Sequence, residues 1–263
     1  MWGLVRGNGQ GWSSPEIVIS LAAGALVLVA FVLWELRAEA PMLPMRFFRN
    51  RVFALANAAS LLMFFGMFGS IFLLSQFFQT VQGYSPIGSG LRILPWTLMP
   101  MFVAPVAGAL SDRIGGGRIM GIGLVLQASG LGAIAALSSA TIPYWELVVP
   151  FMVSGLGMAM FWAPVANVVL GAVRSEEEGQ ASGAQNAIRE LGGVFGVAVL
   201  ASVWAQYGSY SSGPSFVDGM TPALWIGAAI VLAGAVAAFL IPRRGRKVEA
   251  EIPVEAEALL EAA

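Results

Sequence analysis

Long apolar runs alternate along this chain with short segments that hold most of its polar and charged residues. Seven runs contain no charged residue, and each is near or above the roughly 17 to 25 residues that a helix needs to cross a bilayer. These runs are residues 17–34, 52–79, 93–111, 119–137, 147–173, 191–207 and 221–241. They are apolar throughout and do not alternate with a period of two, so they indicate helices and not the strands of a membrane barrel. We therefore predict seven transmembrane helices.

The composition supports a membrane protein that is not an enzyme. Of the 263 residues, 57% are hydrophobic and only 11% are charged, whereas about a quarter of a soluble domain is charged. The chain has no histidine and no cysteine, so a Ser–His or Cys–His catalytic pair cannot form, and the usual ligands of zinc and haem are missing. We expect the lipid bilayer as a partner, and no metal, cofactor or nucleic acid.

The basic residues predict an orientation in the membrane. With alternate loops assigned to one side, twelve of the 14 Lys and Arg residues share that side, and only Arg6 and Arg92 lie opposite. Cytoplasmic loops hold an excess of Lys and Arg. The pattern predicts an outside amino terminus, a cytoplasmic carboxyl terminus and a multi-pass protein of the plasma (inner) membrane.

Proline and small residues suggest helices that bend and pack closely. Pro95, Pro100 and Pro105 fall in the run 93–111, and Pro164 falls in the run 147–173. Each deletes a backbone hydrogen bond and bends its helix, which favours a cavity-lining role for the run 93–111. Small residues four apart, such as Gly192 and Gly196, let two helices approach closely.

A charged, glycine-rich segment joins the third and fourth runs. In "GALSDRIGGGR", Asp112 is expected to accept hydrogen bonds from the amino end of the next helix, and the glycines permit a tight reversal. The segment resembles the G-x-x-x-D-R-x-G-R loop motif of the major facilitator superfamily, in the copy of the second half. The matching residues are Gly108, Asp112, Arg113, Gly115 and Arg118. The resemblance implies a cytoplasmic latch in an alternating-access cycle; a plain capped turn is the alternative.

Two further segments extend this resemblance over essentially the whole chain. Residues 74–98 and 178–200 are similar to segments of the drug:proton antiporters with fourteen membrane spans. The resemblance implies an all-α integral membrane protein with a linker helix and a six-helix domain of 3+3 inverted repeats. The expected parts are an outside loop (1–16), the linker helix (17–36), a cytoplasmic loop (37–51), the six-helix domain (52–241) and a cytoplasmic acidic tail (242–263).

The function implied by the resemblance is that of the carboxyl-terminal half of a proton-coupled multidrug efflux antiporter. Its substrates would be small, amphipathic or cationic drug-like molecules, and the amino-terminal half, which this chain would need, would bind the protons. Within the seven spans we expect no buried acidic residue apart from the borderline Glu190. The alternative is a truncated or non-transporting membrane subunit that needs a first-half partner.

A polar cluster precedes the sixth run and is a candidate gate. It consists of Asn186, Arg189 and Glu190, at the mouth of a span expected to start near Leu191. Asn186 and Glu190 share a helix face, whereas the adjacent Arg189 and Glu190 point about 100° apart and are not expected to pair. The resemblance implies a gating role near the cytoplasm, and ordinary solvated charges at a helix end are the alternative.

Other polar and aromatic residues could line a substrate cavity. The candidates are Arg92, Gln76, Gln79, Trp96, Trp162, Pro164 and Asn167, and less specifically Asn57, Gln127, Phe64, Phe65, Phe77, Phe78, Phe102 and Phe161. Ring faces and a few polar groups suit amphipathic drugs, although membrane aromatics often face lipid or the interface. For Arg92 we favour snorkelling to outer headgroups, with a cavity position as the alternative.

Overall fold

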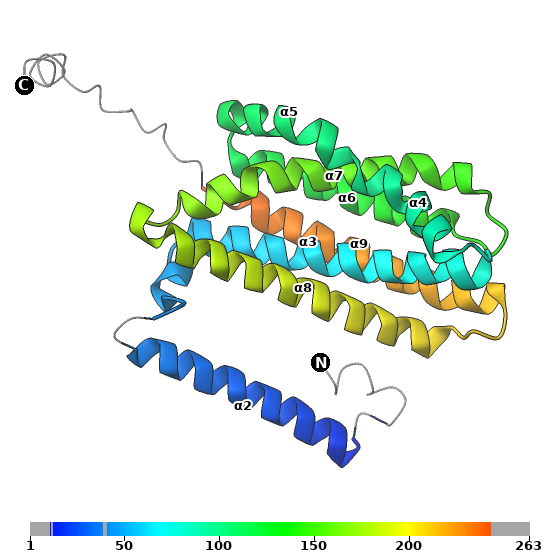
Figure 1. Cartoon of the computed structure of the whole chain (residues 1–263), viewed down its shortest axis with the longest axis horizontal. Helices are drawn as coiled ribbons and strands as arrows, with labels where there is room; N and C mark the ends of the chain where they lie inside the picture. Colours follow the sequence, from blue (N-terminus) through cyan, green and yellow to red (C-terminus); the bar gives the residue numbers. More distant parts are fainter. Residues whose placement is uncertain (1–10, 12, 39–40, 243–263) are drawn as a thin grey trace, which may run out of the picture.

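A computed structural model describes residues 11, 13–38 and 41–242 of the chain as helices joined by short connections (Figure 1). Most of the predicted outside loop and the acidic tail from residue 243 lie outside these residues. The long helices are α2 (Pro15–Arg37), α3 (Arg51–Gln76), α4 (Pro86–Thr97), α5 (Met99–Ile114), α6 (Gly116–Leu137), α7 (Tyr144–Leu170), α8 (Glu178–Tyr207) and α9 (Gly213–Phe239). Short turns are η1 (Met45–Arg49), η2 (Phe77–Val81) and η3 (Ser175–Glu177).

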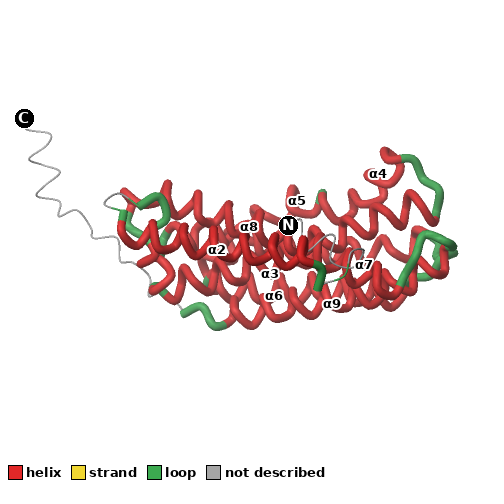
Figure 2. The backbone as a smooth tube through the Cα atoms, turned by 90° about the horizontal axis from the view of Figure 1, so that it is seen from below, coloured by secondary structure: helices red, strands yellow, loops and turns green. Residues whose placement is uncertain are grey.

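Seven helical spans in the described residues are long and apolar enough to cross a membrane, with α4 and α5 forming one span. The predicted number of transmembrane helices is therefore confirmed. Figure 2 shows the connections gathered at the two ends of the helix layer. Each helix can thus satisfy its own backbone hydrogen bonds between those ends, as a chain in lipid must.

Six spans form a bundle whose contacts repeat. The most extensive contacts join α6 to α7 and α3 to α8, followed by α6 to α9, α3 to α9 and α5 to α7. The helices fall into two sets in chain order, α3 to α6 and α7 to α9. Each extensive contact has a counterpart when every helix is replaced by its equivalent in the other set, with α3 equivalent to α7, α4 and α5 to α8, and α6 to α9. The six-helix bundle therefore has the arrangement of two three-helix repeats, as the predicted fold class requires.

The proline-rich span is broken as expected. Helix α4 ends at Thr97, α5 begins at Met99, and Pro95 and Pro105 lie inside the two segments. Pro100 occupies the first turn of α5, where its missing amide leaves no bond unmade. The interruption at Leu98 lets the two segments take different directions along α7 (Figure 1).

Helix α8 begins earlier than the apolar pattern predicted. The expected start was near Leu191, but the helix begins at Glu178. Residues 178–190 contain Ala, Gln, Arg and Glu, which are good helix formers. Because the segment is polar, a search for apolar runs does not detect it as part of the helix. The candidate gate residues therefore lie well inside a helix and not at its mouth.

Helix α2 stands apart from the bundle in Figure 1. Its only buried residues are Ile17 and Glu35. The Glu35 carboxylate accepts a hydrogen bond of 2.9 Å from the Leu43 amide and so holds the reversal after the helix. Glu35 is 6% exposed and Glu190 is exposed, so the prediction that Glu190 was the one borderline buried acid was wrong.

The connection between α2 and α3, called the linker from here on and distinct from the linker helix α2 itself, docks on the connection between α7 and α8. Arg46 and Arg174 both donate hydrogen bonds to the Glu177 carboxylate, and the bond from Arg174 is 2.6 Å long. That bond raises the pKa of the Arg174 guanidinium above its usual value. These contacts tie the linker to the segment that leads into α8.

Two backbone carbonyls complete the docking of the linker. Asn50 Nδ2 donates to the Ala172 carbonyl oxygen at 2.8 Å, and Gln180 Nε2 donates to that of Pro41 at 3.1 Å. The contacts flank Glu177 on both sides along the chain. The linker is therefore fixed to the bundle at one end of α8, although α2 itself has little contact with the bundle.

Candidate functional site

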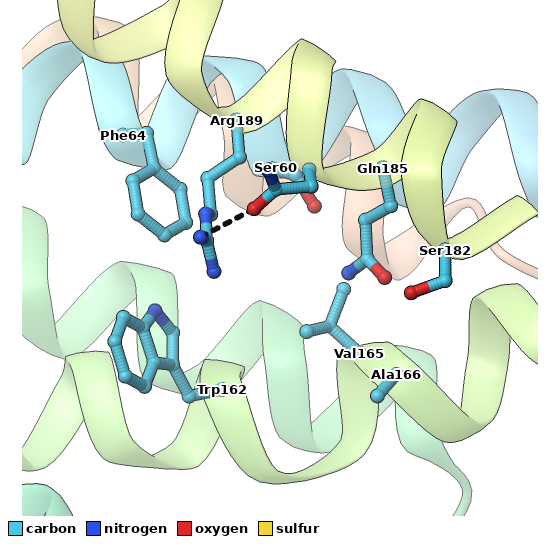
Figure 3. Close-up of a pocket in the computed structure, with 9 residues that line it drawn as sticks. Ser60, Phe64, Trp162, Val165, Ala166, Ser182, Gln185 and Arg189 are labelled. Atoms are coloured by element: carbon cyan, nitrogen blue, oxygen red, sulfur yellow. Dashed lines mark hydrogen bonds between the residues drawn. The ribbon is translucent and has the colours of Figure 1, made fainter. Parts of the chain in front are cut away.

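A cavity of about 200 Å³ lies between α3, α7 and α8 (Figure 3). Of the side chains that line the cavity, two belong to α3, three to α7 and four to α8. Its lining consists of Ser60, Phe64, Trp162, Val165, Ala166, Ser182, Gln185, Asn186 and Arg189. The structure thus brings Trp162 of the predicted cavity together with Asn186 and Arg189 of the predicted gate.

The cavity extends inward from the bundle end where α7 ends and α8 begins, and its inner part lies far from the helix ends. Phe64 follows the start of α3 at Arg51, Trp162 precedes the end of α7 at Leu170, and Arg189 follows the start of α8 at Glu178. At about 1.5 Å per residue, the three residues lie roughly 12 to 20 Å from the same end of the bundle. The hydrocarbon core of a bilayer is about 30 Å thick, so the inner part of the cavity, at these three residues, has the depth of its middle region.

Arg189 reaches across the cavity from α8 toward Phe64 and Trp162 (Figure 3). Its guanidinium carbon lies 5.2 Å from the centroid of the Phe64 ring. Nη2 donates to Asn186 Oδ1 at 2.6 Å, and the same nitrogen lies 3.4 Å from Glu190 Oε1. The prediction that Arg189 and Glu190 would not pair was wrong, because the long arginine side chain folds back along its own helix.

The Glu190 contact is weak, since the Glu190 side chain is 61% exposed and the Arg189 side chain 37% exposed. A single contact at 3.4 Å with a solvated carboxylate stabilises an ion pair little. Asn186, which shares a helix face with both charged residues, is the closer partner. Arg189 is therefore a positioned cation that its neighbours leave largely uncompensated.

Aromatic rings form the side of the cavity opposite α8. Phe64 and Trp162 are stacked, with ring centroids 6.1 Å apart and planes inclined by 19°. Trp162 remains 43% exposed, so part of this residue is uncovered beside the cavity. Pro164 is buried on the same helix and does not contact the cavity, although it lies two residues from Trp162.

Close packing of α8 on α3 holds Arg189 over Phe64. A methyl group added at Gly192 would collide with the backbone of Leu61, and one at Gly196 would collide with the Phe65 carbonyl. These glycines follow Arg189 by one and two helical turns, so the two backbones meet directly beside the cavity. The predicted role of this small-residue pair in helix packing is confirmed.

The loop motif lines a second hollow of about 1150 Å³ at the bundle end where α5 meets α6. Asp112, Arg113 and Arg118 are exposed there, and the predicted cavity residue Asn167 lines this hollow as well. Gly115 makes the reversal with φ of 103°, a conformation that favours glycine. Gly108 lies on α5 where an added methyl group would meet no atom within 4 Å.

Asp112 does not cap the next helix, contrary to our expectation. It lies inside the last turns of α5, and the residue before α6 is Gly115, with no side-chain capping bond. The helix continues past the aspartate, so its carboxylate faces outward before the chain reverses. Within the described residues the Asp112 side chain makes no hydrogen bond or ion pair.

Three other candidates lie away from the cavity. Trp96 is fully buried and stacks on Phe151 with centroids 6.2 Å apart, so it belongs to the packed interior. Gln79 donates to Ser75 Oγ within its own helical segment, and Gln76 is the last residue of α3. Trp96 is therefore part of the packed interior and does not line the cavity, and Gln76 and Gln79 lie near the opposite end of the bundle from the loop motif.

Arg92 is held against two tyrosine rings. Its guanidinium carbon lies 3.3 Å from the centroid of Tyr84 and 5.4 Å from that of Tyr144. Tyr144 Oη donates to the Arg92 carbonyl oxygen at 3.0 Å, and Arg92 Nη1 donates to Gly88. Arg92 therefore does not line the cavity between α3, α7 and α8, and its snorkelling to outer headgroups stays a prediction.

Sequence reasoning missed four of the lining residues, Ser60, Val165, Ala166 and Ser182. Ser60 and the small side chains of α7 carry no distinctive signal. Ser182, Gln185 and Arg189 recur at intervals of three and four on α8, which is the period of one helix face. That stripe of polar residues could have identified the α8 wall if the helix had been extended before Leu191.

Comparison with known proteins places the chain among transporters. The family described as Major Facilitator Superfamily matches residues 7–197 and 96–262. The multidrug resistance protein Stp of Mycobacterium tuberculosis is 33% identical over 207 residues, which cover 79% of this chain and 38% of that protein. The tetracenomycin C resistance and export protein of Streptomyces glaucescens is 31% identical over 210 residues, covering 78% and 38%.

A third relative covers more of both chains. The methylenomycin A resistance protein of Bacillus subtilis is 29% identical over 233 residues, which are 88% of this chain and 50% of that protein. The chain thus spans 38 to 50% of the length of these three relatives. All three are named for resistance: one to multiple drugs, one to tetracenomycin C and one to methylenomycin A.

Proposed function

Because the chain belongs to the Major Facilitator Superfamily, whose members are transporters, we propose that it is the carboxyl-terminal half of a proton-coupled multidrug efflux antiporter. The names of the relatives, which concern drug resistance, support efflux of drug-like molecules. The share of each relative that the chain spans supports a half. An amino-terminal half then binds the coupling protons and completes the substrate path.

The observation that carries this proposal is the cavity between α3, α7 and α8, whose inner part has mid-bilayer depth. Transporters of this general plan bind substrate near the bilayer midplane, where two halves meet. Stacked rings, neutral polar side chains and one cation suit an amphipathic molecule with an apolar body and a polar group. A structural subunit gains nothing from an uncompensated arginine at this depth.

The proposed orientation has the amino terminus outside and the carboxyl terminus in the cytoplasm, in the plasma membrane. The basic residues on one side support it. In this orientation the loop motif lies at the cytoplasmic end, where Asp112, Arg113 and Arg118 are exposed and able to meet another part of the transporter. We assign a latch role to the motif, together with Gly108 and Gly115, and a gating role to Asn186, Arg189 and Glu190.

Reconstitution tests the proposal. The chain is placed in proteoliposomes either alone or joined to the amino-terminal half of a full-length relative, and uptake of a fluorescent drug is followed after a proton gradient is imposed. We expect gradient-dependent uptake by the joined protein and none by the chain alone. Uptake by the chain alone would contradict the need for a first half.

The alternative of a non-transporting subunit makes a different prediction. In the joined protein, Arg189→Gln should slow uptake if the cavity carries substrate, and Asp112→Asn should slow it if the loop is a latch. If both variants transport as well as the parent, these residues have no part in transport. The chain would then support the other half without taking part in the substrate path.

A further inference from the structure

The charge of the cavity between α3, α7 and α8 is unusual for a site expected to take cationic drugs. Arg189 is the one charged side chain among the described residues that line it, and the other eight are neutral. Glu190, the nearest carboxylate, is not in the lining and is 61% exposed. A cation entering this cavity would meet a like charge with no carboxylate facing it.

The guanidinium of Arg189 has donors to spare. Both of its hydrogen bonds use Nη2, with Asn186 and Glu190 as acceptors. Its Nε–H is buried and has no hydrogen-bond partner among the described residues. Guanidinium carries five N–H donors in a planar fork that matches an acidic group with two oxygens.

Rings are placed beside these donors. Phe64 lies 5.2 Å from the guanidinium carbon and stacks on Trp162. Since those two rings already contact each other, a third ring would lie against the uncovered part of Trp162, which is 43% exposed. A molecule whose acidic group is attached to an aromatic ring can therefore meet the guanidinium and the indole together.

We propose that this cavity binds the acidic end of an amphipathic aromatic anion, such as an aryl carboxylate, sulfonate or phenolate. The inference rests on the proposed transport function and gives its substrate class, with anions favoured over the cationic drugs expected from the sequence. The cavity of about 200 Å³ is smaller than a typical drug site of about 300 to 1,000 Å³. It holds one end of the substrate, with the remainder outside the three helices.

A matched pair of fluorescent probes tests the charge preference. 8-Anilinonaphthalene-1-sulfonate and N-phenyl-1-naphthylamine share their ring system, and only the first carries a sulfonate. Each is titrated into the full chain in uncharged maltoside micelles, with protein-free micelles as the blank. We expect the sulfonate to bind at least about ten-fold more tightly than the uncharged probe, as a charge-assisted hydrogen bond predicts.

Four variants separate the role of Arg189 from general effects of charge. Arg189→Gln should weaken sulfonate binding about ten-fold and leave the uncharged probe unchanged, while Arg189→Lys should keep part of the preference. Glu190→Gln should strengthen sulfonate binding about two-fold, because it removes a competing carboxylate. Arg49→Gln is the control, since Arg49 is exposed on η1 and outside the cavity lining.

Two results would overturn the proposal. One is an equal loss of sulfonate binding in Arg189→Gln and Arg49→Gln, which would indicate general charge attraction. The other is displacement of the sulfonate by phosphatidylglycerol but not by phosphatidylcholine or by a short aryl carboxylate, which would make the site a lipid headgroup site. Neither measurement needs transport, so the proposed function could stand or fall independently.

Discussion

Asp112 carries a negative charge in the loop motif, and its side chain has no stabilising contact in the part of the chain that the structure describes. It is exposed on α5 and makes no capping bond to α6. Gly115, three residues later, has no charge, but the reversal of the chain depends on its φ of 103°. Charge and backbone conformation are therefore separate contributions of the motif.

Thermal unfolding of single variants should separate them. Asp112→Asn should change the free energy of unfolding by less than about 0.5 kcal/mol, as is usual for an exposed side chain without partners. Gly115→Ala should lower it by about 1 kcal/mol or more, because a side chain is strained at this φ. A large loss of stability in Asp112→Asn would show that the aspartate does hold the turn.

Sequence reasoning predicted the kinds of side chain that line the cavity better than it predicted which individual residues do so. Asn186, Arg189 and Trp162 were singled out because polar groups and large rings are rare in such apolar surroundings, and they meet in one cavity. Trp96 and Arg92 had the same signal but found partners in Phe151 and in two tyrosine rings. A residue type alone does not tell which of several neighbours a side chain will meet.

Helix α8 owes its position to glycines that meet the backbone of α3. A methyl group at Gly196 would collide with the Phe65 carbonyl, whereas one at Gly183, on the same helix, would meet no atom within 4 Å. The first glycine allows close contact, and the second only lowers helix propensity. The same substitution should therefore have opposite effects at the two positions.

Gly196→Ala should destabilise the bundle by about 1 to 3 kcal/mol through overpacking. Gly183→Ala should leave it unchanged or stabilise it by up to about 1 kcal/mol, since alanine favours the helix. Melting temperatures of the two variants in detergent test this. Equal shifts in both would mean that α3 and α8 do not touch at Gly196.

The linker between α2 and α3 depends on Glu177, whose side chain is 11% exposed and accepts from Arg46 and Arg174. The arginines themselves are 59% and 68% exposed, so water screens each pair and weakens it. We expect a local effect on the linker and little change in the stability of the bundle. The neighbouring Glu178 carries the same charge and is exposed.

Hydrogen exchange of the linker amides tests this docking. Glu177→Gln should speed exchange in residues 43–50 several-fold, because the linker loses its charged contacts to the α7–α8 connection. Glu178→Gln should leave that exchange unchanged. Equal exchange in both variants and the parent would show that the Asn50 and Gln180 bonds hold the linker without Glu177.

Apolar runs predicted the membrane spans because lipid demands continuous apolar helices. They failed where a helix is lined by polar groups, as at the start of α8, and where a carboxylate such as Glu35 is buried by a local hydrogen bond. The break at Leu98 could be foreseen from the prolines around it. How the helices meet, and hence the cavity, depends on contacts between distant residues that no local pattern shows.

Cysteine labelling tests whether the cavity between α3, α7 and α8 is a substrate path. The chain has no cysteine of its own, so a single cysteine introduced into it is unique in the joined protein once any cysteines of the amino-terminal half are replaced by serine. Ala166 lines the cavity, and Ala233 is exposed on the outside of α9; both lie within about two helical turns of the same bundle end. In the joined protein, a water-soluble maleimide should label Ala166→Cys quickly and Ala233→Cys slowly, and an exported drug should slow only the first. Equal labelling at both positions, or labelling of Ala166→Cys that the drug does not slow, would contradict a substrate path through this cavity.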